Sequence, residues 1–205
     1  MKTAIAFRHS LKDGPNDTCG PKGLELAAAQ GAVFFDSAFR VSKATHGVLV
    51  RTAQTLLAFL TAGPSRSVKI LPPIAEFGSN ELFAEMTGHS EFRERAKLAG
   101  NFRALIQCHG HHKCMEWAEQ CAHGVLKFFD QLEEGETGVF VTHSPTLELA
   151  LWELLGYENL PAEFEIFAEM EGVLILLVDG KFILGRKFGL PGTQIKTASA
   201  PIPEK

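Results

Sequence analysis

A short apolar run near the start of the chain, at residues 4–7, ends abruptly in Arg8, His9 and Ser10. Such a run is typical of a buried strand that carries polar groups to the edge of a sheet. In open α/β sheets, ligands bind outside the carboxyl ends of the strands. The pattern therefore predicts that Arg8 and His9 lie at the edge of the core, where a ligand can reach them.

Apolar periodicity, together with Gly, Pro, Asn and Asp at the turns, predicts further elements along the chain. The expected order is a helix at 23–30 that continues toward 35, a strand ending near 46, a helix at 50–62, a strand at 68–71, an irregular stretch at 74–89, helices at 91–107 and 113–132, a strand at 138–142, a helix at 145–155, and a hairpin of strands at 172–178 and 182–185. Alternation of strands and helices predicts an α/β fold, here a three-layer sandwich with a mostly parallel central sheet flanked by helices.

The length of 205 residues suits one domain. We expect this domain to span 1–190, with a small helical cap inserted at about 76–112. The stretch 191–205 is rich in Pro, Ser and Thr, so it is expected to be a loosely ordered tail.

Charge and hydropathy narrow the class of partner. The formal net charge of −4 argues against nucleic acid, which usually selects a basic face. No apolar run is long enough to span a membrane, and no secretory signal follows Lys2. We therefore expect a cytoplasmic protein without a nucleic-acid or membrane partner, and its oligomeric state is open.

A second apolar run, at 139–141, leads through Thr142 into His143 and Ser144, which repeats the design of the opening strand. Arg51 falls in the first turn of the helix expected at 50–62. A cation is unfavourable there because of the helix dipole, so its position suggests that Arg51 interacts with a group outside the helix. Singly, each of these residues is more often a surface charge or a structural histidine. Jointly, two arginines and two histidines predict a cage for a dianion, because guanidinium groups match phosphate oxygens in pairs.

Four segments, in this order, resemble the motifs of the histidine phosphatase superfamily, in its phosphoglycerate-mutase-like branch. They are Phe7-Arg8-His9-Ser10, then the stretch at 19–27 (CGPKGLELA), then Arg51-Thr52-Ala53-Gln54-Thr55, then Val141-Thr142-His143-Ser144. The arginine followed by Gln-Thr is the most specific single piece, and the match in order and spacing covers nearly the whole chain.

The resemblance implies a role for each motif residue. It implies that His9 attacks phosphorus and becomes phosphohistidine, and that Arg8, Arg51 and His143 bind the phosphoryl oxygens. A neutral imidazole is a competent nucleophile, and phosphoryl transfer needs mostly positioning and positive charge. The family needs no metal or other cofactor, so we expect none, and the implied partner is a small phosphorylated substrate or a phosphoprotein.

The resemblance also places an acidic residue after the third strand, where it would protonate the leaving oxygen. Glu76 stands at that position and is the predicted general acid, with Glu81 and Glu85 as nearby alternatives. Near pH 7 this role needs a carboxyl that burial or substrate charge keeps protonated.

The chain departs from the family pattern at several small residues. Ser10 replaces the glycine after the first histidine, and Ser144 and Pro145 follow His143 where glycine is usual. Ser10 and Asn16 are candidate hydrogen-bond donors to phosphate. These departures favour a divergent phosphatase over a sugar-phosphate mutase.

Cysteines and histidines also gather at 108–114, with Cys121 and His123 beyond. These side chains suit zinc, but their spacing matches no standard finger. We interpret the tract as an exposed His-rich linker between two helices rather than a metal site.

The leading hypothesis is a metal-independent phosphatase that hydrolyses phosphomonoesters through phosphorylated His9. The alternatives are a phosphoglycerate-mutase-type phosphotransferase and a non-catalytic phospho-ligand binding protein on the same fold.

Overall fold

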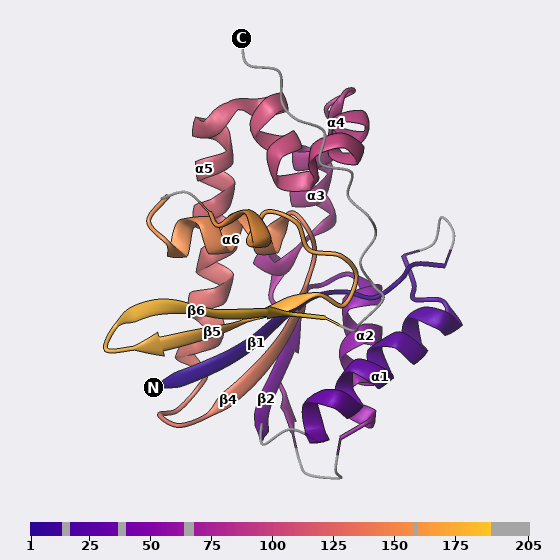
Figure 1. Cartoon of the computed structure of the whole chain (residues 1–205), viewed down its shortest axis with the longest axis vertical. Helices are drawn as coiled ribbons and strands as arrows, with labels where there is room; N and C mark the ends of the chain where they lie inside the picture. The colour runs from indigo at the N-terminus through magenta and orange to yellow at the C-terminus, as the bar shows by residue number, and fades with distance from the viewer. Residues whose placement is uncertain (14–16, 37–39, 64–67, 158–159, 190–205) are drawn as a thin grey trace.

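One mixed sheet forms the centre of the molecule (Figure 1). The computed structural model describes residues 1–13, 17–36, 40–63, 68–157 and 160–189. In this part of the chain, the strand order is β3-β2-β4-β1-β5-β6. The strand bounds are Lys2–Arg8 for β1, Val41–His46 for β2, Lys69–Ile70 for β3, Thr137–Thr142 for β4, Gly172–Val178 for β5 and Lys181–Phe188 for β6. β1 to β4 run parallel, and β5 and β6 add an antiparallel hairpin at one edge, so the predicted mostly parallel sheet is confirmed.

Helices cover both faces of this sheet, as the predicted α/β sandwich requires (Figure 1). One face packs against α1 (Pro21–Asp36) and α2 (Val50–Thr61). The other packs against α5 (Asn101–Asp130) and α6 (Thr146–Leu154). Side chains alternate along β1, so that Ile5 and Phe7 belong to the first core while Ala4 and Ala6 belong to the second. All four are fully buried, which explains why the opening strand reads as a continuous apolar run.

The segment between β3 and α5 differs from the prediction of an irregular stretch at 74–89. It contains a 3-10 turn, η1 (Ala75–Phe77), and a helix, α3 (Asn80–Thr87). Ser79 begins α3, because its side chain accepts a hydrogen bond from the Leu82 amide at 3.1 Å. Serine is a typical helix N-cap, but the glycines at 78 and 88 favoured the prediction of an irregular stretch.

The predicted division between the helices at 91–107 and 113–132 is found at Gly110, and the structure adds a second break at Gly100. α4 (Phe92–Ala99) ends at Gly100, whose φ of 81° breaks the first predicted helix. α5 then runs to Asp130 and is interrupted only at Gly110, which has non-helical angles. The stretch predicted as a cap therefore contains α3, α4 and the first part of α5, above the sheet in Figure 1.

The closing hairpin follows the prediction. Asp179 and Gly180 both have positive φ, 50° and 76°, as a tight two-residue turn between right-twisted strands requires. A short 3-10 turn, η2 (Ala162–Phe164), precedes this hairpin. The predicted tail at 191–205 lies outside the described residues. Across the described ranges, no helix combines the length and the apolar character needed to cross a membrane.

Candidate active site

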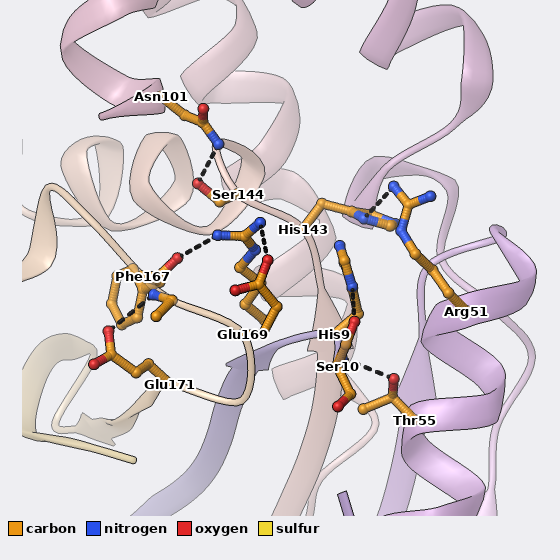
Figure 2. A network of polar contacts seen from close by, with 12 residues as sticks. His9, Ser10, Arg51, Thr55, Asn101, His143, Ser144, Phe167, Glu169 and Glu171 are labelled. Carbon is orange, nitrogen blue, oxygen red and sulfur yellow. Dashed lines mark hydrogen bonds and ion pairs between the residues drawn. The ribbon is translucent and has the colours of Figure 1, made fainter. Parts of the chain in front are cut away.

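The two motif histidines meet at the carboxyl ends of β1 and β4. These strands are parallel neighbours, and their register pairs Arg8 with Thr142, so His9 and His143 follow side by side. The His9 amide donates to the Thr142 carbonyl at 2.9 Å. The two imidazole rings lie 4.8 Å apart, centroid to centroid, and tilted by 56° (Figure 2). Strand pairing thus produces the convergence that the two sequence segments predicted.

His9 is held in one tautomer. Its Nδ1 lies 2.6 Å from the Ser10 carbonyl oxygen, which can only accept, so Nδ1 carries the proton and Nε2 keeps a lone pair. The side chain is only 5% exposed. Burial, followed by the charges of His143, Arg8 and Arg51, holds the pKa of His9 well below its usual range. The imidazole is therefore neutral near pH 7, as a nitrogen nucleophile must be.

His143 has the opposite tautomer. Arg51 Nη2, which can only donate, lies 3.1 Å from His143 Nδ1, so the proton of the neutral ring resides on Nε2. This buried Nε2 has no hydrogen-bond partner among the described residues. Burial and the charges of Arg51 and Arg8 hold the pKa of His143 well below its usual range. An unpartnered buried N–H of this kind is suited to a ligand oxygen.

Arg51 brings a guanidinium group from the first turn of α2, and its side chain is 7% exposed. Besides contacting His143, it forms an ion pair with Asp17 through Nη1. Burial and the charge of Arg8 lower the pKa of Arg51 to about 10, so the group stays charged at neutral pH. Arg51, which was predicted to bind a ligand, thus lies beside both histidines (Figure 2).

Arg8, the last residue of β1, turns toward the segment that precedes β5. Its Nη1 donates to the Phe167 carbonyl at 2.7 Å, and its Nη2 pairs with Glu169 Oε1 at 2.8 Å. The charge of Arg8 still lowers the pKa of both histidines, so it contributes to their electrostatic environment. Two of its donors are thus occupied by protein acceptors.

Ser10 is fully buried and bonded within the protein. Its hydroxyl donates to the Gly23 carbonyl at 2.7 Å, and its amide donates to Thr55 Oγ1 at 3.0 Å. These bonds fasten the turn after β1 to α1 and α2, so the hydroxyl proton predicted to bind phosphate is directed elsewhere. Asn16, the other predicted donor, lies outside the described residues.

Glu76, the predicted general acid, is ion-paired and partly buried. Its carboxylate pairs with Lys127 of α5 and lies 4.0 Å from His123 Nδ1. Burial would raise the pKa of Glu76, but the hydrogen bond and charge of Lys127 outweigh it and lower that pKa. An ionised carboxylate is no proton donor.

The two alternative acids are also placed unfavourably. The Glu85 carboxylate pairs with Lys113 at 2.9 Å, and this hydrogen bond lowers the pKa of Glu85. Glu81 is exposed in the first turn of α3.

The Cys/His tract lies within α5, around the interruption at Gly110. Cys114 and Cys121 are buried in the core, whereas His111 and His112 are exposed. In the described part of the chain, no three His, Cys, Asp or Glu side chains are grouped so as to hold a metal ion.

Three acidic residues near the two histidines and the two arginines were not predicted from the sequence. Asp17 and Glu169 hold the two arginines, and Glu148 is fully buried in α6 next to the turn that follows His143. Asp17 and Glu169 lie in stretches without periodicity, and no spacing signals them. Glu148 did leave a signal, because it stands between two leucines in the mostly apolar run LELALWEL, where a carboxylate is unusual.

Comparison with known proteins gives matches at the level of structure. Neither a family model nor a curated protein matches the sequence. A phosphoserine phosphatase mutant from Entamoeba histolytica, solved with phosphoserine, superposes with a TM-score of 0.59 at 19% identity, covering 95% of this chain and 98% of that one. A phosphoglycerate mutase from Bacillus anthracis gives 0.60 at 13%, covering 89% and 91%. The putative phosphohistidine phosphatase SixA from Agrobacterium tumefaciens gives 0.57 at 15%, covering 91% and 97%.

These solved structures are members of the histidine phosphatase superfamily, and the chain has their fold. The resemblance predicted from four short motifs is thereby confirmed for the fold.

Proposed function

We propose that this chain is a metal-independent phosphatase that hydrolyses phosphomonoesters through a phosphohistidine at His9. The observation that carries the proposal is the meeting of His9, His143 and Arg51 in one buried group, with complementary tautomers on the two imidazoles. A free lone pair on one ring and a free N–H on the other are what in-line attack and stabilisation of a phosphoryl oxygen need.

The first step is binding of the phosphate dianion. Arg51 and Arg8 exchange their contacts with Asp17 and Glu169 for contacts with phosphoryl oxygens. The dianion also raises the pKa of His143, which then binds as a charged donor. Because the transition state spreads charge over the equatorial oxygens, these cations stabilise it directly.

Chemistry then proceeds in two transfers. His9 Nε2 attacks phosphorus in line with the leaving oxygen; the P–O bond breaks as the P–N bond forms, which gives phosphohistidine and an alkoxide or phenolate that takes its proton from solvent. Water next attacks the phosphohistidine, releasing inorganic phosphate and restoring neutral His9. The hydrogen bond from Nδ1 to the Ser10 carbonyl stabilises the positive charge that develops on the ring.

Proton supply limits the range of substrates. Glu76 and Glu85 are both ion-paired in the free protein, and Glu81 is exposed. The proposed site therefore favours esters whose leaving group departs without a proton from the enzyme, and a phosphoprotein with a phosphorylated imidazole meets the same condition. The SixA neighbour is described as a putative phosphohistidine phosphatase, which makes such a phosphoprotein the second substrate class to test.

The experiment compares wild type, His9→Ala and His112→Ala with p-nitrophenyl phosphate. His112 is 94% exposed, so its variant controls for loss of any histidine. We expect turnover, vanadate inhibition and an acid-labile phosphoenzyme in the wild type and the control, and none of these in His9→Ala.

Two results would redirect the assignment. Phosphate binding without turnover would leave a non-catalytic phospho-ligand binding protein. Transfer of the phosphoryl group to an added alcohol in preference to water would favour a mutase-type phosphotransferase.

A further inference from the structure

Glu148 is a carboxyl group sealed inside the molecule, and the proposed reaction assigns it no role. It lies in α6 between Leu147 and Leu149, and all three residues are 0% exposed. Burying a carboxyl group costs free energy unless hydrogen bonds or protonation compensate. The contacts that Glu148 makes should therefore explain its position.

A chain of hydrogen bonds connects Glu148 to the turn after β4. Asn101 Nδ2 donates to Ser144 Oγ at 2.9 Å (Figure 2). Ser144 Oγ in turn donates to Glu148 Oε1 at 2.5 Å, and the Phe167 amide donates to the same oxygen at 3.4 Å. Each Ser144 bond uses a different capacity of the hydroxyl, one as acceptor and one as donor. The network joins the start of α5, the β4–α6 turn and the segment before β5.

Ser144 is the residue directly after His143, so this network acts on the backbone that aims the imidazole. On the other side, Thr142 Oγ1 donates to the Phe77 carbonyl at 2.9 Å. The backbone of His143 is thus fixed by side-chain bonds on both neighbours.

We propose that Glu148 is a positioning residue. By accepting the hydrogen bond of the Ser144 hydroxyl, it fixes the turn after β4 and with it the direction of the His143 imidazole. The effect on catalysis rests on the proposed function, in which the orientation of His143 matters for the reaction. A displacement of about 1 Å at a reacting group can lower the rate about 100-fold.

The surroundings of Glu148 make this role independent of its charge. Burial raises the pKa of Glu148 to about 7, against the opposing effects of the Ser144 hydrogen bond and of Arg8 from β1. The other titratable neighbours are Cys121 of α5, whose pKa Glu148 raises in part, and Glu169, which pairs with Arg8. Since Oε1 accepts two hydrogen bonds, the neutral carboxyl carries its proton on Oε2, and Oε1 holds Ser144 in either state.

The kinetic test uses Ser144→Ala, Glu148→Ala and Glu148→Gln, with p-nitrophenyl phosphate as substrate. Glu153→Gln is the matched control, because Glu153 is the other glutamate of α6. We expect Ser144→Ala and Glu148→Ala to lower kcat about 10- to 100-fold with little change in KM, since the arginines remain in place. Glu148→Gln keeps an oxygen acceptor for Ser144, so its kcat should stay within about threefold of the control.

A second measurement does not depend on turnover. The imidazole nitrogen resonances of His143, observed by NMR on the folded chain, should move in Ser144→Ala and stay in place in Glu148→Gln and Glu153→Gln. Circular dichroism establishes that each variant is folded, and Glu148→Gln preserves the volume of the buried side chain if Glu148→Ala does not fold.

The outcomes separate the two hypotheses. If the wild type hydrolyses no ester but Ser144→Ala still moves the His143 resonances, the positioning role stands and the proposed function fails. If the wild type is active and folded Ser144→Ala changes neither kcat nor these resonances, the positioning role alone is overturned.

Discussion

Each predicted phosphate-binding arginine forms an ion pair with a carboxylate. Asp17 occupies Nη1 of Arg51, and Glu169 occupies Nη2 of Arg8. Under the proposed function, a phosphate dianion displaces both carboxylates, so part of its binding free energy is spent on breaking these pairs. We therefore expect the affinity to depend on the residues that hold the arginines as well as on the arginines themselves.

Replacing Asp17 with Asn should strengthen anion binding. The amide cannot form the ion pair with Arg51, and partly exposed pairs of this kind contribute up to about 1 kcal/mol, so Kd for sulfate should fall about two- to fivefold. Calorimetric titration measures this change. Asp13→Asn, in the same loop but exposed, is the control and should bind as the wild type does. Weaker binding in Asp17→Asn would show that Asp17 supports the pocket instead of competing for it.

Glu76 offers a second prediction at this scale. Because its carboxylate is paired with Lys127, Glu76→Gln should change kcat for alkyl and for nitrophenyl phosphates by the same small factor. A general acid would contribute about 100-fold or more for the alkyl ester alone. The ratio of the two kcat values, measured with the Lys127→Met variant alongside, separates these cases. Selective loss of alkyl-ester turnover would restore Glu76 as the proton donor.

At the scale of elements, the strand ends were the predictable part of the site. The apolar runs before His9 and His143 identify buried strands. Parallel pairing of β1 with β4 is enough to bring the ends of these strands together. The side chains that contact these residues were less predictable. Glu169 lies 161 residues from Arg8 in the chain, and only the folded backbone brings them together. The helix break at Gly100 was not predicted either, because the amphipathic periodicity of the sequence continues across it.

The glycine that follows η1 lies directly against the His143 imidazole. Gly78 has φ of 120°, and a Cβ at this position would lie 2.4 Å from His143 Cδ2. Gly78→Ala should therefore displace the imidazole and lower kcat/KM about 100-fold. Gly135→Ala is the matched control, because Gly135 also has positive φ (82°) but open space around its Cβ position. Both variants place a side chain on backbone of positive φ, so equal losses of activity would argue against a specific effect of the contact with His143.

At the scale of the whole molecule, basic side chains gather at one site in a chain whose net charge is negative. The chain carries a net charge of −4, yet β1, α2 and β4 bring together two arginines and two histidines, of which Arg51 and both histidines are buried and Arg8 is partly exposed. Burial and the charges of Arg8 and Arg51 lower the pKa of both histidines well below its usual range. Under the proposed function, an anion bound beside them would raise both pKa values.

The stability of the protein should consequently fall in mild acid and recover with a dianion. In the unfolded chain, histidine takes up a proton near pH 6.5, whereas buried His9 and His143 do so only at lower pH. The unfolded state therefore binds more protons below about pH 6.5, and the free energy of unfolding decreases as pH falls through this window. Sulfate stays a dianion there, binds the folded state and raises the pKa of both imidazoles, so at 100 times its Kd it should restore about 2.7 kcal/mol. Urea titrations at pH 7.0 and 5.5, with and without sulfate, measure this, with exposed His112→Ala as the control. An acid-induced loss in His9→Ala as large as in the wild type would refute the assignment of that loss to the buried pair.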